Sequence, residues 1–182
     1  IKNQTPSNAI TVGSKVFTEQ NILCHMVSDV IEEETDIPVV RSCNLGGTQI
    51  CFSALQTGSI DLYIDYTGTV YGDTLNYTPI SDIEEVYQTV KRDLKDQYQI
   101  DVLEQMGFNN TYALAVRRDT QEKYQLKTMS DLARVSPELT ISPSLECINR
   151  PDGLVGATEV YHFQFQDVIG IALSHLLNIA HL

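Results

Sequence analysis

Apolar and polar residues near the start of the chain repeat first with the spacing of a strand and then with that of a helix. The run 9–14 (AITVGS) predicts a short buried strand that ends in a turn. Thr18 is a candidate N-cap, and Glu19 suits the first helical turn, where a carboxylate is favoured. We expect the helix to end at the glutamates 32–34 and a second strand to begin at 39–40. The apolar face of this helix comprises Ile22, Leu23, Met26, Val27, Val30 and Ile31.

The same alternation continues over the next segments. Residues 44–48 (NLGGT) are loop-like, and 49–56 (QICFSALQ) reads as a short helix that ends before Gly58. The run 60–66 (IDLYIDY) alternates apolar and polar side chains, which indicates a strand. Strands and helices that alternate in this order favour an α/β layer with a mainly parallel sheet.

A further helix closes the first part of the chain. Residues 81–84 (SDIE) match a capping box, and a strand is expected at 100–104. The segment 106–107 (MG) is the best candidate for a crossing between two lobes. The apolar face of the helix comprises Ile83, Val86, Tyr87, Val90 and Leu94.

A second, smaller α/β unit is predicted after this crossing. It contains a strand at 112–116, a helix at about 130–135 and a strand at 139–142. We therefore expect a first lobe at 1–105 and a second lobe at 106–182.

Candidate site residues follow from the fold class, because ligands in open α/β sheets bind beyond the carboxyl ends of the strands. The residues expected there are rich in hydroxyl and amide groups, include phenol rings, and contain few acid–base candidates. They are Ser14, Lys15, Phe17, Thr18, Glu19, Gln20, Asn44, Gly46, Gly47, Thr48, Asp65, Tyr66, Thr67, Gly68, Thr69, Asn109, Asn110, Thr111, Tyr112, Ser142, Ser144, Glu146 and Arg150.

Motifs of several enzyme classes are absent from the sequence. It contains no G-x-S-x-G, H-E-x-x-H, G-x-x-x-x-G-K-[ST] or G-x-G-x-x-G pattern. The four histidines, His25, His162, His175 and His181, do not pair by sequence with a plausible nucleophile, so we expect structural roles for them. The sequence thus predicts no catalytic residue, no metal ligand and no cofactor.

Charge excludes some partners. The formal net charge of −12 makes non-specific binding to nucleic acid or to an anionic membrane unfavourable, since both are also anionic. The apolar stretch 168–182 is too short and too polar for a transmembrane span, and the polar residues 1–4 read as the start of a trimmed chain.

The four cysteines form no C-x-x-C pair. Cys24 and Cys51 lie on apolar helical faces and are expected to be buried free thiols. A bridge between Cys43 and Cys51 is an open alternative. Cys147 follows Glu146 in the second unit.

Five motifs, in this order, resemble a known family. They are VGSKVFTEQNIL, NLGGTQICFSALQTGSIDLYIDYTGT, GFNNTYALAVR, MSDLA and RPDGLVG. Together they resemble the substrate-binding proteins of osmoprotectant ABC importers, which capture glycine betaine, choline, carnitine and related quaternary amines. The resemblance covers about residues 9 to 170. It implies a two-lobed periplasmic-binding-protein fold of type II-like architecture, with the ligand in the cleft between the lobes.

The resemblance also implies roles for individual residues. Tyr66 and Tyr112 take the places of tyrosines that wall the cationic headgroup of the ligand by cation–π contact. A ligand carboxylate would be met by Lys15, Thr69 and Arg150. The remaining two candidates, Gln20 and Asn110, would shape the polar end of the site.

Structural alternatives remain for these residues. The two tyrosines can pack on the sheet, Lys15 can cap nearby carbonyls, and Arg150 can pair with Asp152 across a turn. Asn110 can serve as a turn residue.

The chain departs from the family pattern at its end. The segment 172–182 (ALSHLLNIAHL) does not resemble the family, whose members continue further, so the second lobe is expected to be incomplete. The resemblance implies an extracytoplasmic location, as a lipoprotein, a permease-fused domain or a periplasmic protein, and a membrane ABC permease as partner. Two other hypotheses are an enzyme on the same fold, for which only Glu19, Asp65 and Glu146 are offered, and a degenerate fragment without ligand.

Overall fold

The run predicted as the first strand is β1 (Ile10–Lys15), which lies at the centre of a three-stranded parallel sheet in the computed structural model. β2 (Val39–Gly46) pairs with one side of β1, and β3 (Leu62–Tyr63) pairs with the other. The structure describes residues 8–171 and divides into two units between Phe108 and Asn109, each with its own sheet and core. The parallel α/β arrangement predicted for the first unit is confirmed.

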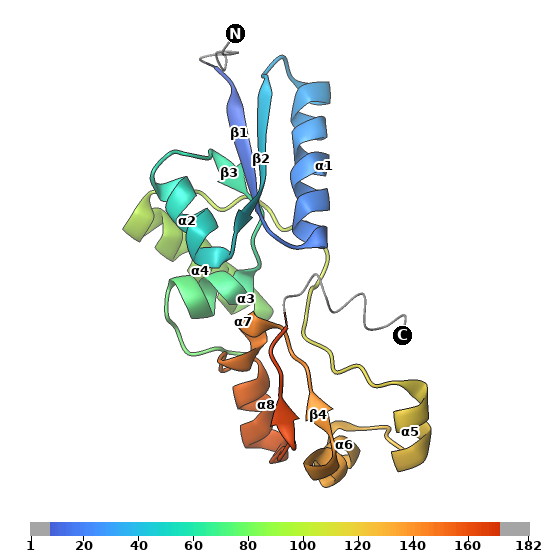
Figure 1. Cartoon of the computed structure of the whole chain (residues 1–182). Helices are drawn as coiled ribbons and strands as arrows, with labels where there is room; N and C mark the ends of the chain where they lie inside the picture. The colour runs from blue at the N-terminus through green and yellow to red at the C-terminus, as the bar shows by residue number, and fades with distance from the viewer. Residues whose placement is uncertain (1–7, 172–182) are drawn as a thin grey trace. The chain divides into compact units, whose positions relative to one another are not determined.

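Two helices connect the strands of this sheet. α1 (Thr18–Glu34) runs alongside β1 and β2, and α2 (Thr48–Gln56) precedes β3 (Figure 1). The prediction of Thr18 as the N-cap of α1 was wrong by one residue. Phe17 holds that position in an extended conformation, and its carbonyl accepts the hydrogen bond from the Asn21 N–H.

Two predicted strands do not form. Residues 100–104 and 112–116 have no regular secondary structure, and within residues 8–171 no strand pairs with either segment. Leu103 and Val116 are 78% and 43% accessible to solvent, whereas Ile100 and Val102 are partly buried against the core of the first unit. Alternating side chains are a local property, whereas a strand also needs a neighbour to accept its hydrogen bonds.

The third predicted strand, 60–66, is much shorter than expected. Only Leu62 and Tyr63 pair with β1, and the chain then enters the short helix α3 (Thr67–Thr69) and a π-helical turn (Val70–Thr74). Tyr66 is the N-cap residue of α3. The candidate residues Asp65 and Tyr66 therefore lie in the connection between β3 and α3.

The helix predicted around Val86 is α4 (Ile83–Tyr98). Its N-cap is Asp82, whose carboxylate accepts the Glu85 N–H at 3.0 Å, so the predicted capping box with Ser81 as the cap was wrong. The core of the first unit consists of Phe52, Val70, Leu75, Val86, Val90 and Leu94.

The second unit has two short parallel strands, β4 (Thr140–Ile141) and β5 (Asp167–Val168). The predicted helix at about 130–135 is confirmed as α6 (Met129–Val135), which begins with a capping box between Thr128 and Asp131. Leu126, Leu132 and Phe163 form the core. The remaining helices, not predicted, are α5 (Arg118–Tyr124), a 3-10 turn (Ser136–Glu138), α7 (Leu145–Ile148) and α8 (Leu154–Tyr161).

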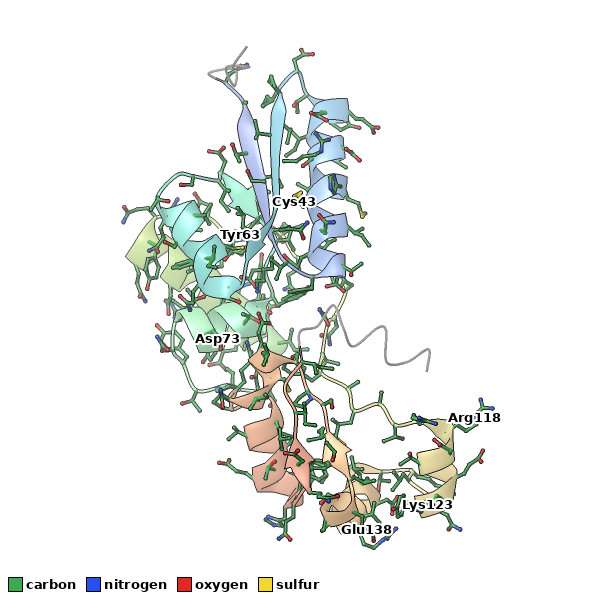
Figure 2. The ribbon with its side chains drawn as sticks, in the orientation of Figure 1. Cys43, Tyr63, Asp73, Arg118, Lys123 and Glu138 are labelled. Atoms are coloured by element: carbon green, nitrogen blue, oxygen red, sulfur yellow. A yellow bond between two sulfur atoms is a disulfide. The ribbon has the colours of Figure 1, made fainter. Side chains whose placement is uncertain are left out.

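A disulfide joins α1 to β2. Cys24 and Cys43 are bonded, with their Cα atoms 6.1 Å apart, so the expectation that Cys24 is a free thiol was wrong. Cys43 is a residue of β2, and it lies beside α1 (Figure 2), which packs along this strand. Cys51 is a buried free thiol, as predicted, and burial raises its pKa; Cys147 is also free.

Some sequence predictions fall outside the described residues. The non-family segment 172–182, with His175 and His181, lies there, as do the polar residues 1–4. Among residues 8–171, no helix has both the length and the apolar character needed to cross a membrane.

We predict that loss of the disulfide destabilises the first unit. The bridge spans a sequence separation of 19 residues. A loop of that length corresponds to about 3 kcal/mol of stabilisation through restriction of the unfolded chain. Thermal unfolding of the Cys24→Ser/Cys43→Ser variant should therefore occur at a lower temperature. Dithiothreitol should lower the melting temperature of the wild type and leave that of the double variant unchanged. Equal sensitivity of both proteins to reductant would contradict the assignment.

The cap of α4 gives a second, matched test. Asp82→Ala should lower the free energy of unfolding by about 1 kcal/mol, because the Glu85 N–H loses its acceptor. Ser81→Ala, one residue away, should change it little. Urea unfolding of both variants measures the difference, and a larger effect from Ser81 would restore the original capping box.

Candidate functional site

The carboxyl ends of β1 and β3 lie side by side, because the two strands are parallel neighbours. Lys15 is the last residue of β1, and Asp65 and Tyr66 follow β3. The first turn of α1 adds Glu19 and Gln20 to the same edge of the sheet. The expected clustering of these residues in the first unit is thus observed.

Lys15 and Asp65 form a buried ion pair. Nζ of Lys15 lies 2.5 Å from Oδ1 of Asp65, and the two side chains are 2% and 9% exposed. Tyr63, at the end of β3 (Figure 2), lies close to the same carboxylate. Burial, reinforced by the negative charge of Asp65, raises the pKa of Tyr63, which therefore stays a neutral phenol at physiological pH.

Tyr66 is held by contacts at its ring and at its hydroxyl. Its phenol donates a hydrogen bond to the Glu19 carboxylate. Its ring is nearly parallel to that of Phe17, with 6.2 Å between centroids and 15° between planes. The face of an aromatic ring is electron-rich and attracts cations. A hydrogen bond from the phenol to a carboxylate makes the ring more electron-rich still. Phe17, which the sequence places just after the first strand without assigning it a role, is thus a second aromatic residue beside Tyr66.

Gln20 stands out by its environment. It is only 1% exposed, and neither its amide nitrogen nor its amide oxygen has a hydrogen-bond partner within the described protein. Buried polar groups are normally satisfied, and those that are not cluster at functional positions. Thr69, on α3, is half-buried near the start of the π-helical turn.

In the second unit, Tyr112 and Arg150 lie next to each other. The Arg150 guanidinium carbon is 6.0 Å from the Tyr112 ring centroid. Tyr112 is half-exposed, and partial burial is the largest of the effects that raise its pKa to about 12. Asn110, two residues before Tyr112, is exposed.

Arg150 makes the contact with Asp152 that the sequence left as an alternative. Its Nε and Nη2 atoms donate to the two carboxylate oxygens of Asp152 at 2.7 and 2.6 Å. The Arg150 residue is 8% exposed. A planar guanidinium bonded in this bidentate way has a fixed orientation, so the face that it presents to Tyr112 is also fixed.

Each unit contains a candidate tyrosine ring and an ion pair: Tyr66 with Lys15–Asp65 in the first unit, and Tyr112 with Arg150–Asp152 in the second. Within the residues that the structure describes, no group of three or more His, Cys, Asp or Glu side chains could hold a metal ion. In the first unit, the Tyr66 ring offers an aromatic face and the Gln20 amide offers a donor and an acceptor.

Comparison with known proteins gives consistent similarities. A family model described as the substrate-binding domain of ABC-type glycine betaine transport systems matches residues 8–173. The carnitine transport binding protein OpuCC of Listeria monocytogenes is 30% identical over 177 residues, which cover 94% of this chain and 58% of that protein. The ergothioneine transport permease/ergothioneine binding protein EgtU of Helicobacter pylori is 30% identical over 168 residues, 92% of this chain and 30% of that protein.

A solved structure supports the same fold. The crystal structure of a glycine betaine/carnitine/choline ABC transporter superposes with a TM-score of 0.69 at 29% identity. The superposition covers 95% of this chain and 66% of that one. The chain thus has the α/β fold of these binding proteins over part of their length.

We predict that the Gln20 amide reduces stability in the absence of ligand. Gln20→Met keeps the length of the side chain and removes two buried polar atoms without a protein partner. The free energy of unfolding should rise by about 1–3 kcal/mol, the usual penalty of such groups. The exposed Gln56→Met substitution is the control and should leave stability unchanged. Urea unfolding without ligand measures both, and a destabilised Gln20→Met protein would show that the amide is satisfied.

Proposed function

Because the chain belongs to the family of substrate-binding domains of ABC-type glycine betaine transport systems, we propose that it is a receptor for a quaternary ammonium solute. The family is one of transport binding proteins, in agreement with the prediction that the chain is not an enzyme. The chain spans 58% of the carnitine-binding relative and 30% of the ergothioneine relative. We therefore also propose, for this chain, the identity of the ligand and its delivery to a membrane permease.

The solutes named for the relatives share one chemical group. Glycine betaine, carnitine and ergothioneine each carry a trimethylated ammonium. This group has no N–H to donate and spreads its charge over methyl groups, so an ordinary hydrogen-bonded salt bridge does not suit it. The negative face of an aromatic ring attracts it by about 0.5–2 kcal/mol per ring, and more strongly where water is excluded.

The position of Tyr66 is the observation that carries the proposal. Tyr66 stands at the carboxyl edge of the sheet, parallel to Phe17 and hydrogen-bonded to Glu19. These contacts support a cation-binding role in the first unit. In the second unit Tyr112 beside Arg150 provides the corresponding ring. We propose that the two tyrosines form parts of one aromatic cage.

A ligand carboxylate needs a different partner. Arg150 is the best candidate, because its guanidinium is fixed next to Tyr112. Lys15 is the second candidate. Each of the two cations already has a carboxylate partner, Asp65 for Lys15 and Asp152 for Arg150, and only Arg150 stands beside Tyr112. Thr69, Gln20 and Asn110 are proposed to bond the polar end of the ligand.

The disulfide supports an extracytoplasmic location. Bonds such as Cys24–Cys43 form and persist in oxidising compartments and are rare in the cytosol. A receptor for an importer works on the outer side of the membrane, as a periplasmic protein, an anchored protein or a permease-fused domain. The compartment and the function proposed here are therefore consistent.

Binding measurements test this function. Isothermal titration calorimetry with glycine betaine, carnitine, choline and ergothioneine should give heat with at least one of them. Tyr66→Ala and Tyr112→Ala should each weaken binding by about tenfold, because each removes one ring from the cation.

Phenylalanine at the same positions is the matched control. Tyr66→Phe and Tyr112→Phe keep the ring and should retain most of the affinity. Absence of heat with all four solutes, together with a melting temperature that none of them raises, would indicate a chain without a ligand and contradict the proposal.

A further inference from the structure

The Lys15 side chain is unusually deep for a charged group. Lys15 is 1% exposed and is the largest fully buried side chain among the described residues. Removing an ammonium from water costs several kcal/mol, which only a well-placed counter-charge offsets. Asp65, with Oδ1 at 2.5 Å from Nζ, supplies that charge from a segment 50 residues away.

The same carboxylate oxygen accepts a second hydrogen bond. Oδ1 of Asp65 also accepts the backbone N–H of Tyr66 at 2.7 Å. This bond fixes the backbone at the N-cap of α3, from which the Tyr66 side chain projects. Nζ of Lys15 lies 5.3 Å from the centroid of the Tyr66 ring, so the ammonium also contacts the aromatic system.

We propose that the buried pair Lys15–Asp65 is a positioning device for Tyr66. Lys15 holds the Asp65 carboxylate in one place, and the carboxylate holds the Tyr66 N–H. The orientation of the ring toward Phe17 and Glu19 follows from that anchor. The proposal rests on the proposed function in so far as it assigns the ring to ligand binding.

A purely structural role predicts a different outcome. Replacing a buried ion pair with uncharged side chains of similar size is often neutral or stabilising. Stability alone therefore does not require these charges. The Tyr66 N–H, in contrast, needs an acceptor at position 65. Variants that remove the charges with and without removing this acceptor therefore distinguish a purely structural ion pair from a pair that positions Tyr66.

Two double variants make this separation. Lys15→Met/Asp65→Asn removes both charges and keeps a side-chain oxygen at position 65 for the Tyr66 N–H. Lys15→Met/Asp65→Leu removes both charges and the acceptor. Neither leaves a buried unpaired charge, so both are expected to fold. The Asp65→Leu double variant, which removes the acceptor of the Tyr66 N–H, should have the lower melting temperature.

Affinity for the quaternary amine should distinguish the two variants. The Asp65→Leu double variant should bind about tenfold more weakly than the Asp65→Asn double variant, the effect of one lost hydrogen bond. Calorimetry at a temperature where both are fully folded measures this. Equal affinities in the two variants, whether high or low, would overturn the proposal, because only the Asp65→Asn double variant keeps an acceptor for the Tyr66 N–H.

A readout without ligand keeps the test independent of the proposed function. In protein labelled with carbon-13 in the tyrosine rings, Tyr66→Phe identifies the Tyr66 signals. Both variants lack the Lys15 ammonium near the ring, so the comparison is between them: the signals of the Asp65→Leu double variant should be shifted relative to those of the Asp65→Asn double variant. If the wild type binds no amine, the receptor function fails, and the ring signals alone decide on positioning. Ring signals that are identical in both variants would refute it.

Discussion

Parallel pairing of β1 with β2 and β3 is the constraint on which the first unit depends. Since all three strands point the same way, the residues that follow them meet at one edge of the sheet. The pairing requires close approach at Gly13, where an added Cβ atom would lie 2.7 Å from Cδ1 of Ile60. A larger residue there would require the Ile60 and Leu45 side chains to move.

Two ion pairs lie among the candidate residues, one in each unit. Lys15 is matched by Asp65 in the first unit, and Arg150 by Asp152 in the second. Such pairs orient neighbouring groups at little net charge. In the proposed function, the aromatic rings are therefore the main attraction for a methylated ammonium, which gains little from a single carboxylate and much from several rings. The net charge of −12 adds a long-range attraction for cations that salt screens.

Local patterns were sufficient for much of the fold. Helical spacing of apolar residues located α1 and α4, and the alternation of elements gave the parallel α/β class. The same local logic failed at 112–116, whose alternating side chains have no partner strand among residues 8–171. It also failed for Cys24, because a disulfide depends on which helix packs on which strand.

The sequence by itself determined the alternation of strands and helices up to β3, the family resemblance and the identity of the candidate aromatic and amide residues, because these are matters of local spacing and residue type. Only the tertiary structure decided the partners of these residues. Lys15 meets Asp65, and Tyr66 meets Glu19, across 50 and 47 positions of the chain. No periodicity encodes such contacts, since they arise only when the strands pair and bring distant segments to one edge of the sheet.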